Sequence, residues 1–379
     1  MEPVELLRKI VEIPSTFPNE ERLGCFLEEE LGRYGFETFR IPISDGRFNV
    51  VGERGNSGKP ILFYGHMDTV PLYGKWNTEP YELSKDGDKL YGLGTFDMKT
   101  GIASILQACE VDSNRRIKIA FGVDEENDSE GSTAIVNNGF VKDVEIGICT
   151  EIASNDNNCL GPQAITLGRR GRCMLEIEVP GRSAHGAYLG MGINAITEAS
   201  KLAIELENMN GYFKEHHVLP RATQQVRTFT AGSGSLSVPE KAILEVDRHM
   251  VTPETVDSVV SSTQKYIDGL YQKGIFKEID GKRITVRVKP RKVPYLMPYV
   301  TTKENIYVKR ISDIVRRHIG EPKDNYGMSV ADENVFANAG VPMISIGPKG
   351  GNEHMANEWV SESSYLELIE ILKEFIRSA

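Results

Sequence analysis

The chain carries the sequence PILFYGHMDTVP at residues 60–71, in which a short apolar run leads directly into His66 and Asp68. Apolar runs of this length are typical of buried strands. Three more such runs are also followed by acidic residues or a histidine: 117–123 before Glu125 and Glu126, 144–149 before Glu151, and 342–346 before His354. Helical patterns separate these runs, so the chain predicts an α/β fold with a mostly parallel sheet flanked by helices.

The sequence pattern changes near residue 164. Alternating strand patterns and two helical patterns follow, as in a small α+β domain, until a helix–strand–helix pattern resumes near residue 292. We therefore expect a larger domain built from residues 1–163 and 292–379, with an inserted α+β domain at residues 164–291. A chain of 379 residues is long enough for two such domains.

Composition and charge exclude several classes of function. The net charge is −10, which argues against a nucleic-acid partner because a phosphate backbone requires a basic surface. The sequence shows neither an uninterrupted apolar stretch of membrane-spanning length nor a basic leader, so we expect no membrane partner. The cysteines are odd in number and scattered, which predicts buried free thiols and a cytoplasmic location: Cys25, Cys109, Cys149, Cys159 and Cys173.

The polar residues after the strands are expected to meet, because the carboxyl ends of parallel strands lie at one edge of a sheet. Asp97 joins them from a glycine-containing loop just before a helix. Each of these residues taken alone could be a turn or cap residue. Together, their carboxylates would repel one another unless cations lay among them. We therefore predict a centre of two divalent metal ions, zinc first and cobalt or manganese as alternatives, with five ligands: His66, Asp97, Glu126, Glu151 and His354.

Two further acidic residues have other predicted roles. Side chains of consecutive residues diverge in an extended chain, so Glu125 can face the cleft as a general base while its neighbour Glu126 binds metal. Asp68 lies two positions after His66, on the same face, and can hold the second nitrogen of that imidazole.

These motifs resemble the zinc-dependent amidohydrolases and exopeptidases that include acetylornithine deacetylase, succinyl-diaminopimelate desuccinylase, glutamate carboxypeptidase and aminoacylase. The resemblance covers nearly the whole chain. It rests on six motifs in this order: GHMDTVP at 65–71, GTFDMK at 94–99, DEE at 124–126, TE at 150–151, GRSAHG at 181–186 and HMANE at 354–358.

The resemblance implies a role for each of these residues. Asp97 would bridge the two ions, with His66 and Glu151 on one ion and Glu126 and His354 on the other. It also implies a cis peptide bond between Asp97 and Met98. The larger domain would be catalytic. The inserted domain would act as a lid that forms a homodimer, in which His185 of one subunit helps to stabilise the oxyanion in the site of the other.

The chain departs from the family pattern where relatives bind substrate. Family members often have an arginine at the position of His249, which here follows Arg248, and another near Asn334. These three residues are candidates for substrate binding, although the changes argue against an arginine clamp on a carboxylate. We expect hydrolysis of the amide bond of an N-acyl amino acid or small peptide, as in acetylornithine deacetylase or succinyl-diaminopimelate desuccinylase. The alternatives are a metallo-carboxypeptidase or dipeptidase of the same family and, in another class, a non-catalytic metal-binding dimeric scaffold.

Overall fold

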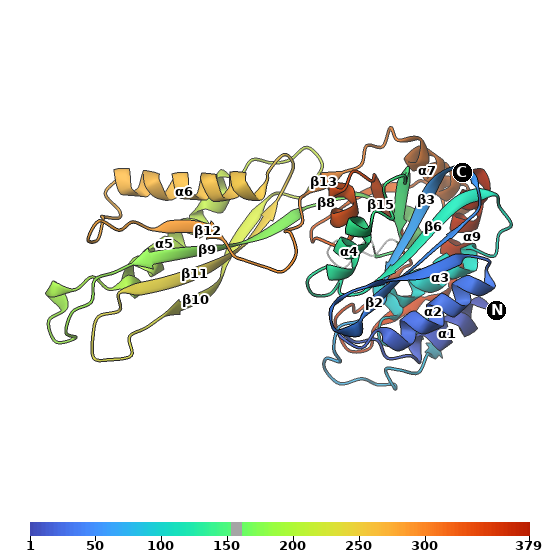
Figure 1. The fold of residues 1–379 in the computed structure, drawn as a ribbon, viewed down its shortest axis with the longest axis horizontal. Helices are drawn as coiled ribbons and strands as arrows, with labels where there is room; N and C mark the ends of the chain where they lie inside the picture. The colour runs from blue at the N-terminus through green and yellow to red at the C-terminus, as the bar shows by residue number, and fades with distance from the viewer. Residues whose placement is uncertain (153–160) are drawn as a thin grey trace. The chain divides into compact units, whose positions relative to one another are not determined.

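The computed structural model describes residues 1–152 and 161–379, which form two compact units (Figure 1). Unit 1 comprises Met1–Arg169 and Val300–Ala379, and unit 2 comprises Arg170–Tyr299. The smaller unit thus spans 170–299, where the sequence predicted an inserted domain at 164–291. The first boundary differs because strand β8 (Ala164–Arg169) pairs with strands of the larger sheet in unit 1.

The elements of unit 1 alternate along the chain as the apolar pattern predicts. Its helices are α1 (Pro3–Val11), α2 (Glu21–Arg33), α3 (Thr100–Ala108), α4 (Glu130–Asn138), α7 (Ile306–Ile319), α8 (Glu333–Asn338) and α9 (Glu362–Ser378). Its larger sheet contains β1 (Glu37–Pro42), β2 (Phe48–Arg54), β3 (Ser57–His66), β6 (Arg115–Gly122), β7 (Ile146–Cys149), β8, β14 (Lys323–Gly327) and β15 (Met343–Ser345), and β13 (Tyr299–Val300) pairs at its edge. A smaller sheet contains β4 (Ser84–Asp86), β5 (Lys89–Tyr91), β16 (Gly350–Gly351) and β17 (Trp359–Ser361).

The centre of the larger sheet is parallel. The strand order is β1-β2-β6-β3-β7-β15-β8-β13, and the pairs β6/β3, β3/β7 and β7/β15 all run in the same direction. The register pairs His66 with Gly122, and Tyr64 with both Ala120 and Cys149. The chain therefore leaves these strands at one edge of the sheet, which confirms a mixed α/β fold with a largely parallel sheet.

The core of unit 1 lies between this sheet and the helices that carry its apolar stripes. Buried side chains of α1, α2, α3, α7 and α9 form one cluster with those of the central strands. In α1, for example, Leu6, Leu7 and Ile10 are fully buried at helical spacing. Helices α4 and α8 pack against each other outside this cluster, and Figure 1 shows α4 across the sheet from α2 and α3. Helices thus cover both faces of the sheet.

Unit 2 is an antiparallel sheet with helices and a core of its own. Its strands are β9 (Gly171–Pro180), β10 (Thr223–Ala231), β11 (Lys241–Met250) and β12 (Thr285–Val288), in the order β10-β11-β9-β12, and its helices are α5 (Ala195–Met209) and α6 (Val256–Gln272). Buried and partly exposed residues alternate along β9 from Gly171 to Glu178, as expected for a sheet with one face against helices. Cys173, Leu175, Ile177 and Val179 supply that buried face.

The cysteines in the described residues are free thiols. Cys109, Cys149 and Cys173 are buried free thiols, but Cys25 is exposed, because it lies on the outer face of α2, away from the buried Leu23 and Leu27. Cys159 lies outside the described residues. None of the helices in the described ranges combines the length and apolarity needed to cross a membrane.

Candidate active site

Every residue predicted to bind metal lies at or just beyond the end of a strand of unit 1, or in a loop. His66 is the last residue of β3, Glu126 lies in the turn after β6, and Glu151 follows β7. Asp97 lies in the helical turn η2 (Thr95–Lys99), and His354 lies in the loop between β16 and β17. The parallel strands therefore deliver most of the site, and the two loops complete it.

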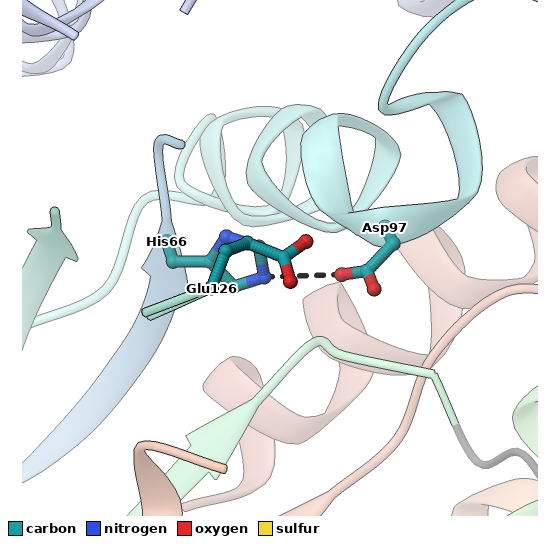
Figure 2. A group of neighbouring side chains, drawn as sticks. All are labelled: His66, Asp97 and Glu126. Carbon is teal, nitrogen blue, oxygen red and sulfur yellow. Dashed lines mark hydrogen bonds and ion pairs between the residues drawn. The ribbon is translucent and has the colours of Figure 1, made fainter. Parts of the chain in front are cut away.

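Asp97 lies between two histidines. Its Oδ1 is 3.0 Å from Nε2 of His66, and its Oδ2 is 3.4 Å from Nε2 of His354. The same His354 nitrogen is 3.0 Å from Oε2 of Glu126. Figure 2 shows His66, Asp97 and Glu126 pointing toward one another, with the contact between His66 and Asp97 dashed. One carboxylate thus faces a different imidazole with each of its oxygens, and the Asp97–Met98 peptide bond is cis, as the sequence resemblance implied.

The cluster extends from the interior of unit 1 to its surface. The side chain of His66 is 1% exposed and that of Asp97 is 10% exposed, whereas His354 is 49% exposed. A ligand can therefore approach from the side of His354, while the groups deeper in the cluster are shielded from water, which strengthens their electrostatic interactions.

Burial and charge oppose each other at Asp97 and the histidines. Burial raises the pKa of Asp97, but hydrogen bonds to His354 and His66 overcome this effect and lower it below its usual value. Hydrogen bonds to Asp97 and Glu126 raise the pKa of His354 to about 11, against the effect of burial. For Glu126, burial and the charge of Asp97 dominate and raise the pKa. Without a bound ion, the two imidazoles therefore supply the positive charge that keeps Asp97 ionised.

Glu125 is an acid with a strongly raised pKa next to this cluster. Burial raises its pKa well above the usual range, His66 opposes that shift, and the charges of Glu151 and Glu126 add to it. Its backbone N–H donates a hydrogen bond to the carboxylate of Asp68, while no hydrogen bond of its side chain is resolved among the described residues. A carboxylate with a raised pKa beside a metal cluster is suited to accept and return a proton near neutral pH.

The structure corrects the role predicted for the carboxylate of Asp68. Nδ1 of His66 is 3.0 Å from the backbone oxygen of Asp68 and 3.7 Å from its carboxylate, so the backbone carbonyl accepts the imidazole hydrogen bond. The carboxylate instead accepts hydrogen bonds from the backbone N–H groups of Glu125 (3.2 Å) and Glu126 (3.0 Å). Asp68 therefore orients His66 through its main chain and holds the Glu125–Glu126 turn through its side chain.

Glu151 has a neighbour that the sequence reasoning missed. Nη2 of Arg169, at the end of β8, is 3.6 Å from Oε1 of Glu151 and 3.0 Å from Oε1 of Glu333. Cys149, Glu151 and Glu333 also lie close enough together to hold an ion. Because Arg169 already supplies positive charge there, we do not assign a metal to that group. A buried arginine beside two carboxylates is visible only once β8 is placed in the sheet of unit 1.

Asn334, a predicted substrate-binding residue, makes a hydrogen bond at the start of its own helix. It is fully buried in α8, where its side-chain oxygen accepts a hydrogen bond from the N–H of Ala331 at 3.0 Å. This contact stabilises the start of the helix, so the structure provides a structural role for Asn334.

The other predicted residues belong to unit 2. His185 is exposed, and its ring centroid lies 5.3 Å from that of Tyr188. Arg248 is buried, forms an ion pair with Glu254 at 2.5 Å and stacks over Phe213 at 4.1 Å. These contacts tie Arg248 to the interior of unit 2.

His249, the neighbour of the buried Arg248, is partly exposed. Burial and the charge of Arg170 lower its pKa to about 4, so its imidazole is neutral at neutral pH. A neutral imidazole can donate or accept one hydrogen bond at each nitrogen, but it cannot replace the positive charge of an arginine.

The arrangement around Asp97 is that of a metal-dependent hydrolase. The donors are imidazole nitrogens and carboxylate oxygens, which zinc and similar ions prefer, and the crowded carboxylates need the charge that such ions supply. The chain belongs to the peptidase family M20/M25/M40, whose model matches residues 62–378.

Relatives and a solved structure agree with this placement. Succinyl-diaminopimelate desuccinylase of Hydrogenovibrio crunogenus is 24% identical over 384 residues, which cover 98% of this chain and 97% of the relative. Carboxypeptidase G2 of a Pseudomonas species is 29% identical over 303 residues, covering 76% and 68%. A dinuclear metal-binding peptidase of the M20 family from Bacillus subtilis has a TM-score of 0.74 at 15% identity, with 99% of this chain and 96% of that chain covered. The chain is therefore a metal-dependent hydrolase of this family.

Proposed function

We propose that the protein is a dinuclear zinc-dependent amidohydrolase that cleaves the amide bond of an N-acyl amino acid or small peptide. The observation that carries this proposal is Asp97, whose two oxygens face His66 and His354 separately. A carboxylate in this position can bridge two ions. Two zinc ions, when bound, would polarise the scissile carbonyl and lower the pKa of a water molecule.

The resemblance to the family supports a division of the remaining ligands into two pairs. His66 and Glu151 would hold one ion, and Glu126 and His354 the other. The hydrogen bond from Nδ1 of His66 to the carbonyl of Asp68 fixes the imidazole so that Nε2, which faces Asp97, is the atom that would bind the ion. Glu126 and His354 are already within hydrogen-bond distance of each other.

Glu125 would act as the general base. It would take a proton from the attacking water and deliver it to the nitrogen of the leaving amine. The carboxylate of Asp68 would keep this base in place by holding the backbone of the Glu125–Glu126 turn.

Two substrate classes are supported by different relatives. The desuccinylase aligns with nearly the whole chain, which favours an N-acyl amino acid. Carboxypeptidase G2 is the more identical sequence over a shorter region, which supports a carboxypeptidase or dipeptidase as the second candidate. The neutral His249, at the position of a family arginine, favours a substrate group recognised by hydrogen bonds rather than by a charged clamp.

We also propose that the enzyme is a cytoplasmic homodimer formed through unit 2, with His185 serving the partner's active site. Unit 2 exposes large apolar side chains, including Leu236 (88%), Tyr212 (74%) and Met191 (71%). β10 also lies at one end of its sheet, where its outer edge can pair with another strand. Sedimentation equilibrium measures the oligomeric state, and a monomer would contradict this assembly.

The function is tested with metal-free enzyme reconstituted with zinc, cobalt or manganese. N-acetyl and N-succinyl amino acids, dipeptides and C-terminally blocked peptides are then offered in parallel. Glu125→Gln should keep both ions and lower kcat by about 10²–10⁴-fold, whereas Glu367→Gln, on the exposed face of α9, should not change it. A Glu125→Gln variant with wild-type turnover would show that the base is wrongly assigned, and a protein that binds no metal would contradict the function as a whole.

A further inference from the structure

Glu358 is a buried carboxylate that the proposed reaction does not use. Its Oε1 accepts hydrogen bonds from the backbone N–H groups of Phe96 (2.7 Å) and Asp97 (2.9 Å), and its Oε2 accepts one from Gly94 (2.7 Å). The residue is 2% exposed. Three backbone N–H groups of one short segment thus converge on this buried side chain, so Glu358 holds the loop before Asp97 in place.

The small sheet of unit 1 brings Glu358 to this loop. β17 begins at the next residue, and its register pairs Trp359 with Tyr91 of β5. The backbone oxygen of Glu358 also accepts a hydrogen bond from Gly92 at 3.2 Å. The loop passes close to this side chain at Gly94, whose φ of +76° favours glycine. Main chain and side chain of Glu358 therefore bind the same loop from two sides.

The same residue is four positions after His354. One side chain thus connects the loop that carries Asp97 with the loop that carries His354, although more than 250 residues separate them in the sequence. His354 reaches Asp97 through a contact of 3.4 Å that depends on the relative position of these two loops.

We propose that Glu358 is a positioning residue for the metal centre, which fixes the backbone of Asp97 relative to His354 and thereby sets the geometry of the ion that they share. This inference rests on the proposed function, because it requires that Asp97 and His354 are metal ligands. Groups that orient metal ligands typically change metal affinity by about 10–100-fold when they are removed.

The test compares Glu358→Gln and Glu358→Ala with Glu367→Gln and Glu367→Ala, the matched changes of an exposed glutamate. Metal-free protein is titrated with Co²⁺ and followed by visible absorption, and with Zn²⁺ by calorimetry. Glu358→Ala should weaken binding of the more weakly held ion by about 10–100-fold and alter its cobalt spectrum. Glu358→Gln should lose less metal affinity than Glu358→Ala. Its amide oxygen can still accept hydrogen bonds from the N–H groups of Phe96 and Asp97, and only the hydrogen bond from Gly94 is lost. Both control variants should match the wild type.

The outcomes separate this inference from the proposed function. If both Glu358 variants bind two ions with wild-type affinity and spectra, Glu358 does not position the metal centre, even if their melting temperatures fall. If Glu358→Ala does not fold, Glu358→Gln decides, and unchanged metal affinity in that variant overturns the inference. A wild-type protein that binds no Co²⁺ overturns the proposed function and this inference with it.

Discussion

At the scale of single residues, His354 links proton binding to metal binding. Hydrogen bonds to Asp97 and Glu126 raise its pKa to about 11, so it keeps its proton at neutral pH when no ion is bound. Because the folded-state pKa is above the ordinary value of about 6.5, this proton stabilises the metal-free fold fully below pH 6.5. The stabilisation is lost as the pH rises toward 11.

Metal binding should therefore displace a proton from His354, since only the neutral imidazole can bind an ion. We expect the apparent affinity for Zn²⁺ to rise between pH 6 and pH 8, by about tenfold per pH unit for each proton displaced. Calorimetric titrations in buffers of different ionisation enthalpy count the released protons. An affinity that does not depend on pH, with no proton release, would contradict this description of His354.

The sequence predicted that His66, Asp97 and Glu126 lie together, as they do, but not which of their atoms meet. His66, Glu126 and Glu151 could be named because each follows an apolar run, and parallel strands end at one edge. The choice between the carbonyl and the carboxylate of Asp68 as partner of His66 depends on backbone angles, which spacing does not determine. Arg169 and Glu358 were missed because their partners lie far away in the sequence.

At the scale of elements, a buried ion-pair network holds the turn after β6. Arg47, just before β2, forms ion pairs with Glu20 at the start of α2 (2.9 Å) and with Asp124 (3.3 Å). The side chains of all three are at most 8% exposed. Asp124 directly precedes Glu125 and has a positive φ of 71°. The network therefore joins α2 and β2 to the turn that carries the general base.

Arg47→Met should be strongly destabilising, because it leaves two buried carboxylates without their cation. We expect a loss of about 3–5 kcal/mol in the free energy of unfolding, measured by urea denaturation. Arg40→Met is the matched control: Arg40 also stacks on a phenylalanine, but its ion pair with Glu28 is exposed, so the loss should be about 0–1 kcal/mol. The double variant Glu20→Gln, Arg47→Met should be less destabilised than the sum of the two single changes. Equal losses for Arg47→Met and Arg40→Met would contradict the network.

Elements with long apolar runs were predictable, and those without them were not. β3, β6 and β7 follow clear apolar patterns, whereas β1 and β2 were not predicted. β1 lies at the sheet edge, and in its burial pattern only Ile41 is buried, so it lacks the apolar signal of a central strand. β8 was assigned to the inserted domain because its sequence runs on into β9, and only strand pairing places it in unit 1.

At the scale of the whole molecule, all the predicted metal ligands belong to unit 1. Unit 1 is built from two separate chain segments, whereas unit 2 is one continuous segment with its own buried core. Ligand binding stabilises the folded form of the part that contains the site. The effect of metal on stability should therefore be confined largely to unit 1.

Zinc should raise the temperature of one thermal transition and leave a second nearly unchanged. At a free Zn²⁺ concentration of 100 times Kd, the expected stabilisation is about 2.7 kcal/mol, or a shift of about 5–10 °C for a unit of this size. Differential scanning calorimetry of the full chain, with Zn²⁺ and with a chelator, measures both transitions. His66→Ala removes a ligand from unit 1 only and should abolish the shift, whereas His216→Ala, in unit 2, should preserve it. If zinc raises both transitions equally, or if the chain unfolds in one transition, the stabilisation is not confined to unit 1.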